Sequence, residues 1–258
     1  MRAVKLTVCL LTFNSERLLE EVIPPLLSVA DELVVLDSGS SDRTREICER
    51  FGLQPRYRPY RTHADAMNHA VSLAASDWVL CIDSDEVLDP QTVAEILKVK
   101  EGPEPDTGTA FRISRHWHVL GREVHAIYPI SSPDYPVRLF NRRHVRFNDS
   151  PVDDKAQGAA RTRILPGRVR HDTFYSLDEV FSKLNGYTSR LVRYSNVQPS
   201  LARAFFSGFF AFFKWYFRKG SWRDGKVGLV AAVYASLYSF LKYFKAWYHA
   251  PTGKDAVR

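Results

Sequence analysis

The 258-residue sequence is poor in cysteine and methionine, and it lacks an uninterrupted apolar run of the ~20 residues that a simple membrane-spanning helix needs. Its three cysteines, Cys9, Cys48 and Cys81, lie far apart, which argues against a disulfide framework or a metal cage and favours reduced core residues. Residues 1–5 lead into no long apolar core and no cleavage site. We therefore expect no secretory signal and a cytosolic protein.

Charge is distributed unevenly along the chain. Residues 1–137 contain 14 basic and 21 acidic side chains, whereas residues 200–258 contain ten basic and two acidic ones. A basic tail on an acidic front half indicates a surface for an anionic partner, either lipid or nucleic acid.

Apolar runs and helical patterns alternate over the first hundred residues. Strands are expected near 6–11, 33–36, 54–57 and 78–82, and helices near 16–29, 42–50 and 64–75. This β-α-β-α-β-α-β order predicts an α/β fold with a mainly parallel sheet and helices on both faces. Ser15 is expected to cap the first helix, and Pro24-Pro25 is a potential break within it.

Three carboxylates, Asp83, Asp85 and Glu86, follow the apolar strand at 78–82. Side chains at i and i+2 of an extended segment point the same way, so Asp83 and Asp85 can face one target. A divalent cation that bridges to a diphosphate is one interpretation of this pair. The alternative is a solvated acidic loop ahead of a helix that starts at Asp89-Pro90.

Polar loops follow three of the predicted strands, at Thr12, Asp37 and Asp83. Because parallel strands end at the same edge, we expect these loops to converge where open α/β sheets bind ligands. The alternative for Asp37 is an ordinary capped turn.

The pattern changes after the Gly102–Gly108 linker, where short alternating runs suggest antiparallel or edge strands. Trp117 lies among polar and aromatic residues and could stack on a sugar or simply pack. Asp153 and Asp154 follow an arginine-rich stretch, and a carboxylate there is either a solvated ion pair or a general base in a cleft. A helix is predicted over 177–194, with Ser176 and Glu179 as a capping box.

The last stretch is aromatic and basic. Residues 205–217 contain nine aromatic side chains, and residues 227–241 form a second, uncharged run. Aromatic residues with flanking lysine and arginine suit the bilayer interface. A helical pair packed on the catalytic core is the alternative, a re-entrant hairpin remains open, and nucleic acid is disfavoured because phenylalanine crowding exceeds what base stacking uses.

The loops after the strands carry recognisable motifs: Leu11-Thr12-Phe13-Asn14, Val35-Leu36-Asp37-Ser38-Gly39-Ser40-Ser41-Asp42, and the D-x-D element Asp83-Ser84-Asp85-Glu86. With these motifs the chain resembles family 2 glycosyltransferases of the GT-A fold. Arg138-Leu139-Phe140 and a later series look like the bacterial lipopolysaccharide-core branch of heptose β-1,4-glucosyltransferases; the series is His171, Tyr175, Lys183, Asn185 and Tyr187.

The resemblance implies a nucleotide-sugar donor, usually UDP-linked, a Mg²⁺ or Mn²⁺ ion, and inversion at the anomeric carbon. Carried over by position, it implies donor-binding roles for Thr12, Asn14, Asp37 and Asp83. It implies metal ligation by Asp85, Asp83 and His171, and acceptor binding by Arg138. Trp117 is the second expected acceptor contact, on the ground of its ring. Related chains often have a basic or glutamine pair at Ala66-Met67, so Arg61 or His63 is a further donor contact. The branch often carries Val-His-Glu at Val152-Asp153-Asp154, which favours Asp154 as the base and leaves Asp153 as the alternative.

These expectations define a membrane-associated inverting glycosyltransferase at the cytoplasmic face of the inner membrane, peripheral or monotopic. It would move a hexose, with glucose favoured, to a lipid-anchored glycan such as the lipopolysaccharide inner core. A polyprenyl-phosphate glycosyltransferase and a non-catalytic membrane adaptor are the alternatives. The expected parts are a nucleotide-sugar-binding half (1–101), an acceptor-binding half (102–198) and a membrane-surface segment (199–258). The sequence leaves the oligomeric state open.

Overall fold

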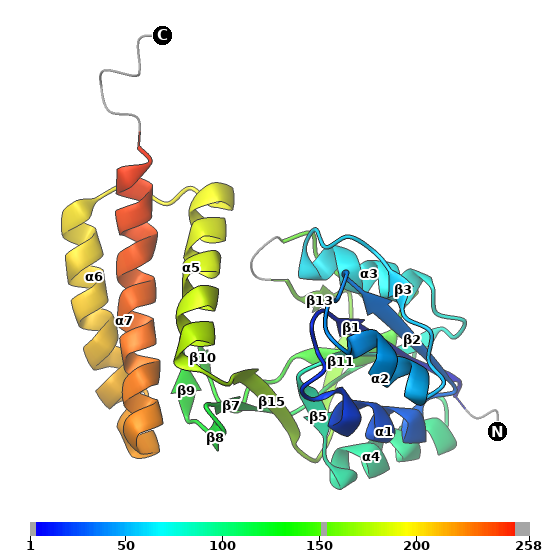
Figure 1. Ribbon diagram of the computed structural model, residues 1–258. Coiled ribbons are helices and arrows are strands. Elements are labelled where there is room, and N and C mark those ends of the chain that lie inside the picture. Colours follow the sequence, from blue (N-terminus) through cyan, green and yellow to red (C-terminus); the bar gives the residue numbers. More distant parts are fainter. Residues whose placement is uncertain (1–3, 151–153, 251–258) are drawn as a thin grey trace. The chain divides into compact units, whose positions relative to one another are not determined.

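The computed structural model describes residues 4–150 and 154–250, and these fall into two compact units (Figure 1). The first unit comprises the described residues of 1–116 and 134–171, and the second comprises those of 117–133 and 172–258. Two strands pass from one unit to the other, β7 (Arg115–Val119) and β15 (Val169–Phe174).

The first unit is the α/β unit that the alternating pattern predicts. Its elements are β1 (Leu6–Thr12), α1 (Leu19–Val29), β2 (Glu32–Asp37), α2 (Thr44–Arg50), β3 (Arg56–Tyr57), α3 (His63–Ser72), β4 (Trp78–Asp83), β5 (Glu86–Leu88), α4 (Pro90–Glu101), β6 (Thr109–Arg112), β11 (Val137–Asn141), β12 (Arg146–Phe147), β13 (Ala156–Gln157) and β14 (Arg161–Ile164).

The seven-stranded sheet of this unit has the order β14-β6-β11-β4-β1-β2-β3. Strands β1 to β4 run parallel, and β11 enters antiparallel between β4 and β6. Figure 1 shows α3 on the opposite face of this sheet from α1 and α2. Cys9 and Cys81 are reduced and buried in the core beneath α3, in agreement with the prediction from their apolar runs.

The first helix differs from its prediction at both its start and its middle. It begins at Leu19 because the Ser15 hydroxyl is engaged elsewhere, with the Phe13 amide at 3.1 Å and the Ser84 hydroxyl at 2.7 Å. The predicted Ser15 cap is therefore wrong. Pro24 and Pro25 do not split the helix, because a buried apolar stripe holds it against the sheet on both sides of the prolines: Leu19, Val22, Ile23, Leu26 and Val29.

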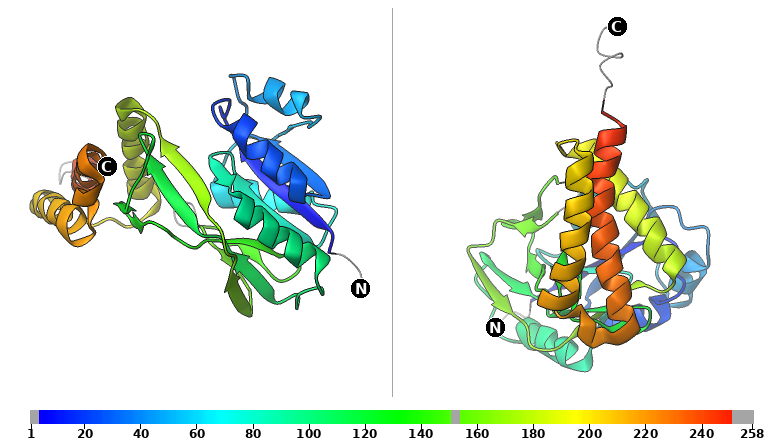
Figure 2. Two further views of the ribbon diagram at one scale, coloured as in Figure 1. Left: turned by 90° about the horizontal axis from the view of Figure 1, so that it is seen from below. Right: turned by 90° about the vertical axis from the view of Figure 1, so that its left-hand side faces the viewer.

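The second unit contains three long helices and short strands. Its elements are β8 (Arg122–Glu123), β9 (Ala126–Ile127), β10 (Ile130–Ser131), α5 (Leu177–Tyr194), α6 (Leu201–Phe213), the π-helical turn η1 (Lys214–Arg218), the 3₁₀ turn η2 (Ser221–Asp224) and α7 (Gly225–Tyr248). Helix α7 lies between α5 and α6, as the right view of Figure 2 shows.

Helix α5 has the bounds that the sequence predicts. Ser176 accepts a hydrogen bond from the Glu179 amide at 3.1 Å, as expected of a capping box. The Glu179 carboxylate reaches back to the amide of Tyr175, one residue earlier than in the standard motif.

Candidate active site

The carboxyl ends of β1, β2 and β4 lie side by side, as predicted for the loops at Thr12, Asp37 and Asp83. Thr12 pairs in register with Asp37, and Leu11 pairs with Asp83. The three loops therefore form one edge of the sheet, where ligands bind in open α/β folds.

The Asp37 carboxylate is satisfied mainly by its own loop. Its Oδ1 accepts the amides of Gly39 at 2.9 Å and Ser40 at 2.8 Å. Its Oδ2 accepts the hydroxyls of Thr12 at 2.9 Å and Ser40 at 2.5 Å. This is the capped turn considered above, and it fixes the shape of the β2 loop. Donor binding by Thr12 and Asp37 stays a prediction.

Asn14 joins the β1 loop to the β2 loop. Its side-chain oxygen accepts a hydrogen bond from the backbone amide of Ser41 at 2.9 Å, and its backbone amide donates to the Ser40 hydroxyl at 2.8 Å. Its φ of 48° lies in the left-handed region, which asparagine tolerates better than most residues. Asn14 thus shapes this edge, and its predicted donor contact remains untested.

The Asp83 carboxylate, in contrast, is held by charged groups from distant segments. His63 donates from Nε2 to Oδ1 at 2.7 Å, and Arg138 donates to Oδ2 at 2.7 Å. Burial alone would raise the pKa of Asp83, but the positive charges of His63 and Arg138 hold it well below its usual range. Asp83 is therefore a carboxylate at any physiological pH.

Glu86 is fully buried and organises the base of this site. One of its oxygens accepts from Arg138 at 2.6 Å and from Arg115 at 2.9 Å, and the other accepts the Asp83 amide at 3.1 Å. Arg115 also pairs with Asp134 at 2.6 Å. Because a buried carboxylate needs such partners, Glu86 locks the turn that follows β4.

His63 also reaches the predicted base. Its Nδ1 donates to Oδ2 of Asp154 at 2.7 Å, so the imidazole bridges Asp154 and Asp83. Burial would lower the pKa of His63, but the two carboxylates outweigh it and hold the pKa well above its usual range. Burial would likewise raise the pKa of Asp154, and the hydrogen bond from His63 brings it below its usual value. The bridge is thus an imidazolium between two carboxylates.

Asp85 has a different partner from Asp83. The chain turns at Ser84 and Asp85 and is not extended there, so the i, i+2 argument does not apply. The Asp85 carboxylate lies 3.2 Å from Nε2 of His171, on β15. A carboxylate and an imidazole that face each other are a suitable donor pair for a divalent ion whose remaining ligands come from a diphosphate. Within residues 4–150 and 154–250, no group of three or more His, Cys, Asp or Glu side chains is arranged to hold a metal ion by itself.

The remaining predicted site residues lie in varied surroundings. Arg61 is exposed just before α3, and Arg138 is 4% exposed beneath Asp83 and Glu86, so a direct contact to an acceptor would require it to leave both carboxylates. Trp117 belongs to the second unit and packs partly buried against its apolar core. Asp153 lies outside the described residues. The roles of all four stay predictions.

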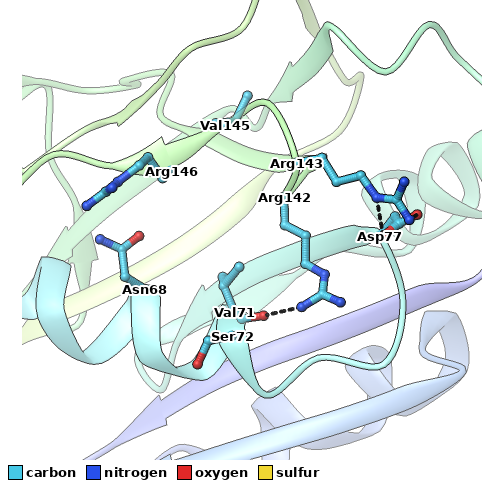
Figure 3. Close-up of a pocket in the computed structure, with 8 residues that line it drawn as sticks. All are labelled: Asn68, Val71, Ser72, Asp77, Arg142, Arg143, Val145 and Arg146. Atoms are coloured by element: carbon cyan, nitrogen blue, oxygen red, sulfur yellow. Dashed lines mark hydrogen bonds and ion pairs between the residues drawn. The ribbon is translucent and has the colours of Figure 1, made fainter.

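A cavity of about 430 Å³ lies at the other edge of the sheet (Figure 3). Arg143 pairs there with Asp77, at the start of β4, and Arg142 reaches the Val71 carbonyl oxygen at 3.3 Å. Since Asp83 ends the same strand, this cavity is separate from the carboxylate site.

Comparison with known proteins identifies the family. Residues 7–165 match the sequence profile described as "Glycosyl transferase family 2". This match covers more than half of the chain, and the chain belongs to that family.

Two curated relatives match over most of their length. LpsC of Rhizobium meliloti, a "lipopolysaccharide core biosynthesis glycosyltransferase", is 26% identical over 94% of this chain and 92% of its own. An "uncharacterized glycosyltransferase" of Rickettsia bellii is 25% identical over 93% of this chain and 85% of its own. A solved structure, glucosyl-3-phosphoglycerate synthase from Mycobacterium tuberculosis with Mn²⁺ and UDP-glucose, is 25% identical over 45% of this chain and 44% of its own. Its TM-score is 0.37.

Sequence reasoning considered His63 only as a donor contact, and it gave no role to Arg115 or Asp134. The signal for Glu86 was its place in the acidic run, but the run does not reveal which carboxylate turns inward. No signal in the sequence links His63 to Asp154, because the two residues are 91 positions apart.

Proposed function

We propose that this glycosyltransferase moves a hexose, glucose by preference, from a UDP-sugar to a lipid-anchored glycan such as the lipopolysaccharide inner core. The observation that carries the proposal is a set of carboxylates at one sheet edge, Asp83, Asp85 and Asp154. His63 bridges Asp83 and Asp154, and His171 faces Asp85. The role of LpsC in lipopolysaccharide core biosynthesis supports the acceptor class.

Asp85 and His171 would hold a Mg²⁺ or Mn²⁺ ion, with Asp83 beside them near the donor. When bound, such an ion neutralises the charge that develops on the leaving diphosphate. Glu86 and Arg138 fix Asp83 in place, so the donor side of the site is organised before the sugar nucleotide arrives. The loops shaped by Asp37 and Asn14 would receive the nucleoside.

Asp154 acts as the general base in this proposal. Its Oδ2 accepts from His63, and its other oxygen, Oδ1, would take the proton from the acceptor hydroxyl. The lowered pKa keeps this carboxylate ionised at neutral pH. A single displacement, with the hydroxyl attacking opposite the leaving diphosphate, inverts the anomeric carbon.

The second unit has two features that bear on the acceptor. Trp117 offers a ring for sugar stacking. The aromatic and basic helices would bring the enzyme to a membrane surface, at the cytoplasmic face of the inner membrane, where a lipid-anchored acceptor is reached. Among the described residues, one helical stretch, Ser221–Tyr248, is long and apolar enough to cross a bilayer, and 39% of its most apolar part is buried.

The test is a thermal-shift screen of nucleotide sugars with Mn²⁺, followed by measurement of UDP release with the stabilising donor. Asp85→Ala should abolish metal-dependent turnover while the fold survives. Retained metal-dependent activity in that variant would refute the metal assignment. A phosphate acceptor needs no strong base, so full activity in the double variant Asp153→Asn/Asp154→Asn would favour a polyprenyl-phosphate acceptor instead. No hydrolysis of any UDP-sugar would favour a non-catalytic adaptor.

A further inference from the structure

Helix α6 has the reverse of the usual distribution of apolar side chains. Its large rings are between 44% and 65% exposed, together with one ring of η1: Phe205, Phe206, Phe209, Phe210, Phe213 and Phe217. Phe205 also contacts the ring of Phe240 on α7, with 5.3 Å between the ring centroids. Its buried residues are small: Ala204, Gly208 and Ala211. A helix that packs on a core in water buries its large apolar residues, so this exposed row, here called the Phe face, requires another environment.

The packing of α6 on α7 fixes the Phe face outward. A Cβ on Gly208 would lie 3.1 Å from Cβ of Phe240 and 3.2 Å from the carbonyl oxygen of Ser236, so the two helices approach closely there. The Ser207 hydroxyl donates to the Ser239 carbonyl oxygen at 2.9 Å. Small residues at a close helix contact are the arrangement that helices use when lipid covers their other side.

Charge identifies the partner. Basic side chains accompany the Phe face at both ends of α6, and all are exposed: Arg203, Lys214, Arg218 and Lys219. Within the described residues 200–250 the single carboxylate is Asp224, which accepts hydrogen bonds from the backbone amide and the ring of His125. A phenylalanine surface edged only by cations fits the interface of an anionic bilayer.

The apolar helix α7 is the obvious candidate for insertion, but its neighbours oppose a spanning role. Lys245 on α7 donates to the Asn185 carbonyl oxygen at 2.9 Å, to the Thr188 hydroxyl at 2.8 Å and to the Ser189 hydroxyl at 2.9 Å, all on α5. Helix α5 also carries five charged residues: Asp178, Glu179, Lys183, Arg190 and Arg193. If α7 crossed the bilayer, it would take these charges into hydrocarbon, which is costly.

We infer that α6 lies in the plane of an anionic membrane with its Phe face inserted among the lipids, and that α7 is its support and does not span. The inference deepens the proposed membrane association and rests on it for the presence of a lipid surface. Arg203 and Lys214 are eleven residues apart, about three helical turns, so both lie along the same side of α6. In this position they can meet lipid phosphates.

The test compares two paired substitutions in the full-length protein, on vesicles of phosphatidylcholine with and without phosphatidylglycerol. Phe206→Gln/Phe210→Gln removes two rings of the Phe face. Leu229→Gln/Val233→Gln is the matched control, with the same spacing on the exposed side of α7, where the residues are 45% and 36% exposed. We expect the α6 pair to lower the vesicle partition coefficient by about tenfold or more, and the α7 pair to change it little.

Three results would overturn the inference. The α6 pair could bind like the wild type, or the α7 pair could lose as much binding as the α6 pair. The wild type could also be a lipid-free dimer that the α6 pair makes monomeric, which would assign the Phe face to a protein interface. Circular dichroism checks that both pairs fold. Asp85→Ala should bind vesicles like the wild type, so a failed donor assignment and a failed lipid assignment give different results.

Discussion

Two loops at the same sheet edge satisfy their carboxylates in different ways. Asp37 accepts from backbone amides and hydroxyls, most of them within three residues of itself. Asp83 accepts from the charged side chains of His63 and Arg138, which lie 20 and 55 positions away. The neutral hydrogen bonds around Asp37 set the shape of one loop. The charged side chains around Asp83 connect the other loop to distant segments of the unit, and the strength of that connection depends on the ionisation of those side chains. The two loops should therefore respond to substitution by different amounts.

The largest effect is expected where the charged network meets the reaction. Asp154→Asn keeps the shape of the side chain but removes its capacity to take a proton, so turnover should fall by about 10²–10⁴-fold. Steady-state UDP release measures the loss, and calorimetry with UDP and Mn²⁺ should show donor binding little changed. Equal losses of turnover and donor affinity would place Asp154 on the donor instead.

Glu86→Ala should give the largest loss of stability. It leaves the guanidinium groups of Arg138 and Arg115 buried without their shared carboxylate, which costs about 3–5 kcal/mol. Urea unfolding measures the loss. Glu95→Ala removes a carboxylate that pairs with Lys98 on the surface of α4, and it should cost no more than about 1 kcal/mol. Similar losses in both variants would show that the Glu86 network is no stronger than a surface pair.

The pH dependence of stability tests the imidazolium bridge. Because the pKa of His63 is raised in the fold, its contribution is complete below the unfolded value of about 6.5 and is lost as pH rises through the folded value. The pKa values of Asp83 and Asp154 are lowered, so their contributions hold above about pH 4 and are lost as pH falls through the folded values. The stability difference between wild type and His63→Gln should thus shrink as pH rises from about 6 to 9.

His69, also on α3, provides the control of opposite sign. Burial and the charge of Arg58 lower the pKa of His69, so the fold favours its neutral form. The wild type should therefore lose stability relative to His69→Gln as pH falls from the unfolded value of about 6.5 through the folded value, and the difference should be constant below that. The effect should be small because this side chain is only partly buried. Urea midpoints across the same pH range measure both variants. A His63→Gln difference that grows with pH would contradict the bridge.

The sequence predicts the parts of this molecule that depend on neighbouring residues. Short apolar runs predict the parallel strands, and Ser176 predicts the start of α5. Asp89-Pro90 predicts the start of α4, where Asp89 accepts the Thr92 amide at 2.7 Å. Ser15 shows the limit, because its hydroxyl contacts Ser84 from another loop and so caps no helix.

The charged network depends on distances that no local pattern contains. It forms because α3 starts at His63 beside the end of β4, and because β11 inserts Arg138 antiparallel to that strand. The sequence placed the acidic run at the edge of the sheet, but it did not show that Glu86 turns inward while Asp83 and Asp85 take separate partners. The orientation of Glu86 and the partners of Asp83 and Asp85 depend on which cationic side chains the tertiary fold brings near each carboxylate.

The smallest effect is expected at the neutral turn. Asp37→Asn keeps an oxygen for the amides of Gly39 and Ser40, and the hydroxyls of Thr12 and Ser40 can rotate to meet its amide group. The free energy of unfolding should therefore fall by no more than about 1 kcal/mol, as urea denaturation measures. UDP affinity separates the two roles of this residue. If the turn alone needs Asp37, UDP should bind Asp37→Asn nearly as well as the wild type. If the carboxylate itself contacts the nucleoside, as the family resemblance implies, affinity should drop while stability is preserved.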